Sequence, residues 1–172
     1  MNLVPQYAFF VAGTGTHLNR LHAFENALLN AGPIAHNLVA VSSILPAGCK
    51  IITPGEGFAM LKLGAITFCV MAREDTDVPD RWASASVGVV KPKDPNRAGY
   101  LSEYHGHASS REDAARTAQW LAREMFEVKF GCKIADLELE NIEAAAASIR
   151  HPGGDVWVSA VALCMLVLCA RD

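Results

Sequence analysis

The spacing of hydrophobic and polar residues predicts a chain of strands interrupted by two helices. Apolar side chains recur every three or four positions over 21–31 and 114–128, as they do on the buried face of a helix. Each of these segments is followed by a glycine, Gly32 or Gly131, a residue that commonly ends helices. Mostly apolar runs predict strands at 7–12, 37–42, 64–72, 82–90, 99–107, 139–150 and 156–168.

Cap and turn residues refine the helices and the loops. Ser109 and Glu112 have the spacing of a capping box, so we expect Ser109 to begin the second helix. Glu112 and Arg116 lie four positions apart and are expected to pair on the exposed side of that helix. The glycine-containing segments 13–19 and 53–57 are expected to be loops.

The order of these elements indicates an α+β protein. It runs strand, helix, two strands, and after one further strand the same series follows again, which suggests two strand-helix-strand-strand units. Two facing sheets, each covered on its outer side by one helix, would bury all of the apolar faces. The pattern by itself leaves other α+β arrangements open.

Length and composition favour one domain that buries surface against other subunits. A chain of 172 residues can form a good hydrophobic core, and we expect 1–172 to be a single domain. Hydrophobic residues make up 51% of the chain and charged residues 19%, which favours a core plus buried interfaces. The net charge of −3 and the lack of a basic run argue against nucleic-acid binding. A mildly acidic protein suits a cationic substrate.

The cysteines and apolar segments favour a cytoplasmic protein. The five cysteines are odd in number and include no C-x-x-C pair, so we expect reduced thiols rather than disulfides or a zinc site. His105 and His107 alone are too few ligands for a metal. The first residues lack the basic region of a signal peptide. The apolar stretch 156–170 is shorter than the roughly 18 residues of a membrane helix, and its valines and Ser159 favour a buried strand, with a tail anchor as the alternative. No membrane partner is therefore expected.

The pair Ser42–Ser43 carries the most distinctive candidate chemistry. It ends the apolar run that begins at Asn37 and leads into a turn at Pro46. A serine hydroxyl held in such a turn can attack the preceding carbonyl group and convert the peptide bond into an ester. Elimination of that ester can leave a pyruvoyl group, so the chain would make its own electrophilic cofactor. For the serine pair alone, a strand followed by a serine-containing turn is the simpler interpretation.

Three segments together resemble the family of pyruvoyl-dependent arginine decarboxylases. The similarity extends over most of the chain, from about residue 7 to residue 167, and is looser between 49 and 97. Its most specific part is the sequence Ser-Ser-Ile-Leu-Pro. The segments, in chain order, are LHAFENALLNAG at 21–32, NLVAVSSILP at 37–46 and YLSEYHG at 100–106.

The resemblance implies that the chain is a zymogen that cleaves itself between Ser42 and Ser43. Autocatalytic cleavage would give a β chain of residues 1–42 and an α chain of residues 43–172. Ser43 would become the pyruvoyl group, which acts as the electron sink that other decarboxylases obtain from pyridoxal phosphate. Neither pyridoxal phosphate nor a metal is therefore expected, and none of the lysines lies in a recognisable phosphate-binding sequence.

The resemblance also implies the remaining parts of the site and the assembly. Asn37 corresponds to an active-site asparagine, and Glu103 to a glutamate proposed as the proton donor. The implied fold is a four-layer α/β/β/α sandwich. The implied assembly is a cytoplasmic homotrimer with active sites at its interfaces, or a dimer of such trimers. The reaction would convert L-arginine to agmatine, a precursor in polyamine biosynthesis, and carbon dioxide.

Substrate choice depends on Glu25, which stands where the family usually has aspartate. The carboxylate would bind the substrate guanidinium group across a slot lined by side chains such as Leu28. Its arm is one methylene longer than that of aspartate, so the same chemistry on another amino acid remains an alternative. A second alternative is a homologue that does not process itself and binds a small molecule or a protein on the same scaffold.

Overall fold

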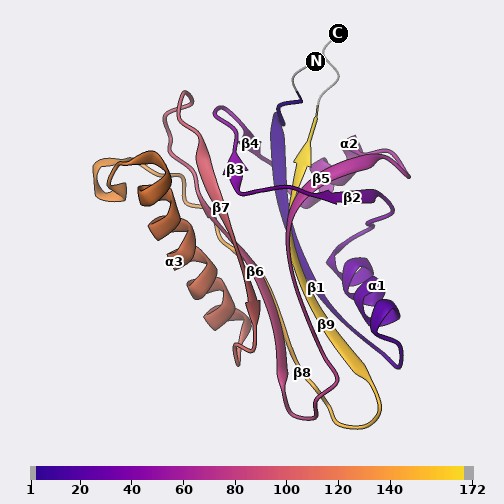
Figure 1. The fold of residues 1–172 in the computed structure, drawn as a ribbon. Coiled ribbons are helices and arrows are strands. Elements are labelled where there is room, and N and C mark those ends of the chain that lie inside the picture. The colour runs from indigo at the N-terminus through magenta and orange to yellow at the C-terminus, as the bar shows by residue number, and fades with distance from the viewer. Residues whose placement is uncertain (1–2, 169–172) are drawn as a thin grey trace.

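The computed structural model describes residues 3–168, which form four layers (Figure 1). A five-stranded sheet and a four-stranded sheet face each other. Helices α1 (Arg20–Ala31) and α2 (Pro54–Met60) lie outside the first sheet, and α3 (Arg111–Phe130) covers the second. The α+β, four-layer α/β/β/α sandwich expected from the sequence is confirmed.

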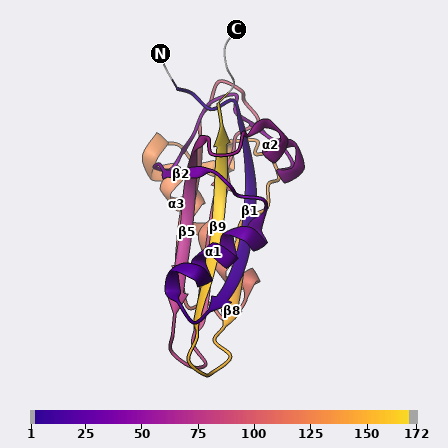
Figure 2. The ribbon, with the colours of Figure 1, turned by 90° about the vertical axis from the view of Figure 1, so that its right-hand side faces the viewer.

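The first sheet has the strand order β2-β5-β9-β1-β4. Its central strand β9 runs antiparallel to both of its neighbours, β1 and β5. Figure 2 views this sheet from the side on which α1 crosses it. Its strands are β1 (Tyr7–His17), β2 (Asn37–Ala40), β4 (Lys50–Ile51), β5 (Ile66–Thr76) and β9 (Trp157–Val167).

The second sheet has the strand order β3-β7-β6-β8, and all of its strand pairs are antiparallel. A short 3-10 helix, η1 (Ile134–Asp136), follows α3 and leads back toward this sheet. The strands of this sheet are β3 (Ile44–Leu45), β6 (Trp82–Val90), β7 (Gly99–Gly106) and β8 (Ala145–Arg150).

The chain changes sheet more than once. It leaves the first sheet after β2 and enters the second at β3, and it returns from β8 in the second sheet to β9 in the first. The first sheet therefore contains the three strands of the first predicted series together with β9 of the second, whereas β7 and β8 of the second series lie in the other sheet. The first of these changes takes place at residues 41–43, which include the serine pair.

Alanine and other small side chains fill much of the space between the sheets. Ala85, Ala160 and Ala162 are fully buried there, beside Leu101 and Val158. Small residues on both inner faces let two sheets approach closely at native packing density. Strand alternation then turns every second residue outward, toward the helices.

Glycines allow both long helices to lie directly on the strands. A Cβ atom added at Gly15 would lie 2.2 Å from the backbone oxygen of Ala23 in α1, and one at Gly88 would lie 2.3 Å from that of Ala118 in α3. The expectation that 13–19 is a loop was wrong, because β1 continues to His17 and its glycines are the floor on which α1 packs.

Segment 53–57 was also expected to be a loop, and most of it lies in helix α2. Thr53 and Glu56 form a capping box, and Pro54 occupies the first turn, where a missing N–H does no harm. Gly57 is buried against the ring of Phe9, which leaves no room for a side chain at that position. Cap and packing together outweigh the low helix propensity of glycine.

Smaller differences concern α3 and the last strands. The side chain that caps α3 is Ser110 rather than Ser109, and Arg116 pairs with Asp113 rather than with Glu112. Gly131 ends the helix in the left-handed conformation, as expected. The strand expected to start at residue 139 becomes regular only at β8. The apolar β9 is a buried strand, and no helix within residues 3–168 is long and apolar enough to span a membrane.

Candidate active site

The Ser42–Ser43 bond lies where the chain crosses from one sheet to the other. On one side, the backbone N–H of Val41 donates to the carbonyl oxygen of Cys69 in β5, at 2.9 Å. On the other side, the N–H of Leu101 in β7 donates to the carbonyl oxygen of Ser43, at 2.7 Å. The bond is therefore held between two rigid strands, although the serines themselves belong to neither sheet.

A tight turn brings a hydrogen-bond donor to the carbonyl group of the candidate scissile bond. The N–H of Ile44 donates to the carbonyl oxygen of Ser42, at 3.1 Å, and closes a three-residue turn around Ser43. Ser43 has a negative φ, so the turn is of the common inverse kind. An N–H in this place would stabilise negative charge on the Ser42 oxygen if the hydroxyl group of Ser43 attacked the adjoining carbon.

An apolar hollow adjoins the serine pair. Its volume is about 370 Å³, and apolar side chains supply most of its wall. Within residues 3–168 neither serine hydroxyl group is hydrogen-bonded to another residue. The hollow is lined by Leu3, Pro5, Val41, Ser42, Ile44, Pro46, Phe68 and Leu166.

Glu103 approaches the serine pair from β7. It lies two residues beyond Leu101, a rise of about 7 Å along the strand, and faces the inter-sheet space as Leu101 does. Although the residue is exposed in the single chain, partial burial of the carboxyl group raises its pKa above the ordinary value, while His105 opposes this shift. The group is thereby biased toward the protonated form that a proton donor needs.

His105 shares that face of β7 and reaches across to the other sheet. Its Nδ1 lies 3.2 Å from a carboxylate oxygen of Glu74 in β5. The sequence pattern does not single out Glu74, because this residue lies 31 positions before His105 and in a different sheet. His107 instead donates from Nδ1 to the carbonyl oxygen of Trp82, at 2.7 Å, so the two histidines do not converge on one point.

The other predicted site residues lie elsewhere in the single chain. Asn37 begins β2, about 16 Å of extended chain before Ser42, and its amide donates to the carbonyl oxygen of Gly64 at 2.8 Å. Glu25 is exposed on α1, outside the first sheet. Leu28 is buried in the core between α1 and that sheet. Within one chain, Glu103 therefore follows the β7 residue that is bonded to Ser43, whereas these three residues belong to other segments.

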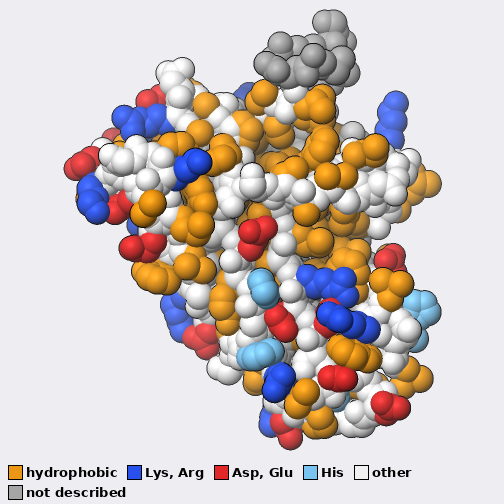
Figure 3. Space-filling model, in the orientation of Figure 1, with side chains coloured by type: hydrophobic (Ala, Val, Ile, Leu, Met, Phe, Trp, Pro, Cys, Tyr) orange, Lys and Arg blue, Asp and Glu red, His pale blue; other side chains and the backbone are white. Residues whose placement is uncertain are grey.

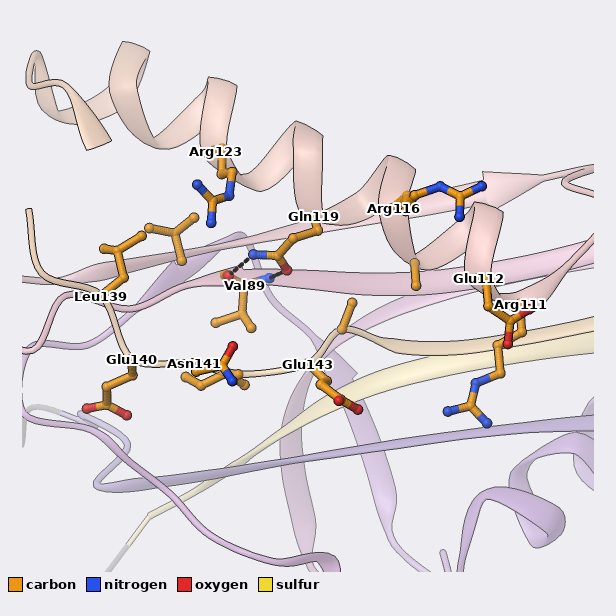
Figure 4. Close-up of a pocket in the computed structure, with 14 residues that line it drawn as sticks. Val89, Arg111, Glu112, Arg116, Gln119, Arg123, Leu139, Glu140, Asn141 and Glu143 are labelled. Atoms are coloured by element: carbon orange, nitrogen blue, oxygen red, sulfur yellow. Dashed lines mark hydrogen bonds between the residues drawn. The ribbon is translucent and has the colours of Figure 1, made fainter. Parts of the chain in front are cut away.

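A larger hollow, about 460 Å³ in volume, contains none of the predicted site residues. It lies between α3 and the segment 139–144 (Figure 4). The side-chain amide of Gln119 projects from α3 toward β6. It accepts from the backbone N–H of Val89 and donates to the backbone carbonyl oxygen of the same residue. No cluster of three or more potential metal ligands occurs among the described residues.

Comparison with known proteins gives a consistent result. A family model described as pyruvoyl-dependent arginine decarboxylase matches residues 7–169. A pyruvoyl-dependent arginine decarboxylase 1 of Methanosarcina acetivorans is 34% identical over 96% of this chain and 98% of its own length. A pyruvoyl-dependent arginine decarboxylase 2 of Archaeoglobus fulgidus is 44% identical, over 78% of this chain and 84% of the relative. A probable pyruvoyl-dependent arginine decarboxylase of Chlorobaculum tepidum is also 44% identical, over 76% and 72%.

Proposed function

Because the chain belongs to the pyruvoyl-dependent arginine decarboxylase family, we propose that it cleaves itself between Ser42 and Ser43 and then converts L-arginine to agmatine and carbon dioxide. Membership makes it a lyase whose prosthetic group is a pyruvoyl group. The observation that carries the proposal is the turn in which the Ile44 N–H donates to the Ser42 carbonyl oxygen, with Ser43 at its centre.

Self-cleavage follows from this geometry in balanced steps. The hydroxyl oxygen of Ser43 attacks the carbonyl carbon of Ser42, and the Ile44 N–H stabilises the negative charge on the carbonyl oxygen. The C–O bond forms first and the C–N bond then breaks, with the hydroxyl proton passing to the departing nitrogen, which yields an ester and an amine. Elimination removes the Cα proton of residue 43 and releases the Ser42 carboxylate. One water molecule then hydrolyses the remaining enamine, which releases ammonia and leaves the pyruvoyl group at position 43.

The surroundings of Ser43 suit a decarboxylase. The pyruvoyl group, once formed, supplies the electron sink for loss of carbon dioxide. The Leu101 N–H fixes the Ser43 carbonyl group, and Glu103 follows two residues later on the same face. The raised pKa of the Glu103 carboxyl group, caused by burial, supports its role as the acid that protonates the product carbon. Glu103→Gln should therefore cleave itself normally and decarboxylate about 10²–10⁴-fold more slowly.

We propose a homotrimer, because Glu25 is exposed on α1 outside the first sheet and the amide of Asn37 is bonded to the Gly64 carbonyl oxygen rather than to the serine pair. A neighbouring subunit would supply Glu25 for the guanidinium group and Asn37 for the pyruvoyl end of the site. Apolar side chains on and beside the edge strand β2, including Val39, Ile44 and Ile66, are exposed in the single chain and would be covered. Pairing of trimers and a cytoplasmic location remain predictions.

Subunit mixing tests the shared site. Co-expression of Glu25→Gln and Glu103→Gln chains should restore about one quarter of the wild-type activity, because a quarter of the interfaces then combine two intact residues. Each variant alone should remain impaired. Activity that stays at the level of the single variants would place both residues in the same chain and refute the shared site.

Mass spectrometry of Ser43→Ala tests the cleavage. We expect wild-type protein to separate into chains 1–42 and 43–172, the second blocked at its N-terminus, whereas Ser43→Ala stays whole. Ser42→Ala is the matched control, because it keeps the attacking hydroxyl group and should still be cut. An uncut wild type would favour the alternative of a scaffold that does not process itself. In a separate activity assay, turnover of lysine or ornithine in preference to arginine would favour the alternative of the same chemistry on another amino acid.

A further inference from the structure

Charged side chains are confined to one place between the two sheets. Strand alternation assigns Glu74, Glu103 and His105 to the inner faces, and they are the only acidic or basic residues there along the described strands. Figure 3 shows acidic and histidine side chains gathered in the lower middle of one face, between the α3 side and the α1 side. The remaining inner positions are mainly alanine, valine and other apolar residues.

The contact between His105 and Glu74 joins the two sheets. At 3.2 Å between Nδ1 and the carboxylate oxygen, it is the only side-chain hydrogen bond from one sheet to the other within residues 3–168. The Glu74 side chain is 20% exposed and that of His105 is 64% exposed. Glu74 is thus the better-fixed partner, and it holds the imidazole ring on the side of β7 that also carries Glu103.

Along the described strands, no other charged side chain lies on the inner faces beside this pair and Glu103. The inner positions of β6 beside Glu103 are Ala85, Val87 and Val89, and the crossing from β2 contributes the two uncharged serines. The nearby thiol of Cys69 has its pKa raised to about 11 by burial, so it is neutral at physiological pH. Burial likewise keeps the pKa of Cys164 in β9 far above its ordinary value.

We propose that Glu74 and His105 are positioning residues that together control the protonation of Glu103, and thereby the pH range in which the enzyme decarboxylates its substrate. The inference rests on the proposed role of Glu103 as the proton donor. It adds two residues that do not touch the reacting atoms. The two are expected to shift the protonation of Glu103 in opposite directions.

The two signs follow from the charges. A protonated His105 favours the carboxylate form of Glu103, so its removal should raise the pH at which Glu103 loses its proton. Glu74 is an anion on the facing sheet, so its removal should lower that pH and leave the charge of His105 unopposed. Coulomb's law gives shifts of roughly 0.5–1 pH unit for charges about 7 Å apart near a partly wet surface.

The test is the pH dependence of kcat for arginine in the self-cleaved enzyme. We expect the alkaline limb to move up in His105→Gln, down in Glu74→Gln, and to an intermediate position in the double variant. His107→Gln is the matched control for the histidine, because its partner is the Trp82 carbonyl oxygen, and Asp77→Asn is the control for charge at the end of β5. Both controls should keep the wild-type profile, and all variants should still separate into two chains on a denaturing gel.

The outcomes separate this inference from the proposed function. If Glu103→Gln retains wild-type activity, Glu103 is not the proton donor and the proposed role fails. If Glu103→Gln is slow but the alkaline limb stays in place, or moves in the same direction, in His105→Gln and Glu74→Gln, only the control by the pair is overturned. Opposite shifts of the alkaline limb in His105→Gln and Glu74→Gln support the control by the pair. A loss of folding alone would lower kcat without shifting the alkaline limb in opposite directions in the two variants.

Discussion

The hydrogen bond to the candidate scissile carbonyl group can be removed without changing any side chain. Replacing Ile44 by the α-hydroxy acid of the same shape turns the link between residues 43 and 44 into an ester and deletes one N–H group. That N–H donates to the Ser42 oxygen and not to β7, so the pairing of β3 keeps its other partners. The change therefore tests the turn itself.

The expected effect is a large fall in the rate of self-cleavage. Loss of one donor to a developing oxyanion slows related acyl transfers by about 10²–10³-fold, or about 2.7–4 kcal/mol in the activation free energy. The donor distance of 3.1 Å lies at the outer end of the effective range, so we expect the lower figure of about 10²-fold. The rate constant is measured by following conversion of the uncut chain into two chains on a denaturing gel, with intact masses as a check.

The same replacement at Ile52 provides the control. Its N–H donates to the carbonyl oxygen of Ala8 at 2.9 Å, an ordinary bond between strands away from the serine pair. Losing it should lower stability by about 1 kcal/mol and leave the cleavage rate unchanged. Wild-type cleavage in the Ile44 variant, or equal slowing in both variants, would show that the turn does not assist the reaction.

Three further predictions concern the substrate, the packing and the thiols. Glu25→Gln should raise KM for arginine and leave self-cleavage intact, whereas Glu25→Asp should keep much of the activity; unchanged arginine kinetics in Glu25→Gln would remove that role. Gly88→Ala should destabilise the protein by about 1–3 kcal/mol, because its Cβ would meet the α3 backbone, whereas Gly55→Ala, with nothing within 4 Å, should not lower Tm; equal Tm values would contradict this. Burial raises the pKa of Cys49 to about 11, so about a thousandth of this thiol is ionised at pH 8. Alkylation followed by peptide mapping should therefore find Cys132 labelled well before Cys49, and the reverse order would refute it.

Helix α3 can be predicted from the sequence because its apolar spacing and its terminal glycine agree. Apolar residues recur at helical spacing from 114 to 128, about four turns, although Met125 and Val128 are exposed. Gly131 adopts the left-handed conformation that ends the helix. The cap is harder to place, because Ser109 and Ser110 are both followed three positions later by an acidic residue. Only the structure shows that Ser110 accepts the Asp113 N–H.

Glycines account for the two wrong loop predictions. Gly13 and Gly15 belong to a strand on which a helix rests, and Gly57 belongs to a helix that rests on an aromatic ring. The sequence does not distinguish a glycine that allows close packing from one that allows a turn. The residue that packs against it is distant in sequence. The cap Thr53 with Glu56 is the local feature that identifies α2.

The candidate site is predictable only where its residues are neighbours in the chain. The serine pair and Glu103 each lie in a recognisable segment, and the structure brings these segments together through β3 and β7. The contact between Glu74 and His105 depends on how two sheets face each other, which no local pattern records. Leu28 was expected to line a slot and lies in the core, because the apolar face of α1 that contains it turns toward β1 and β9.

Cutting the chain at the sheet crossing changes the molecularity of folding. Residues 1–42 would then be a separate polypeptide that carries β1, α1 and β2, held by the 11 residues of β1 between β9 and β4. The uncut chain reaches this arrangement in a first-order process. The mature protein, once unfolded, must bring two polypeptides together again, so its recovery becomes concentration-dependent and fails on dilution. Under the proposed cleavage, the chain would therefore have to fold before it is cut.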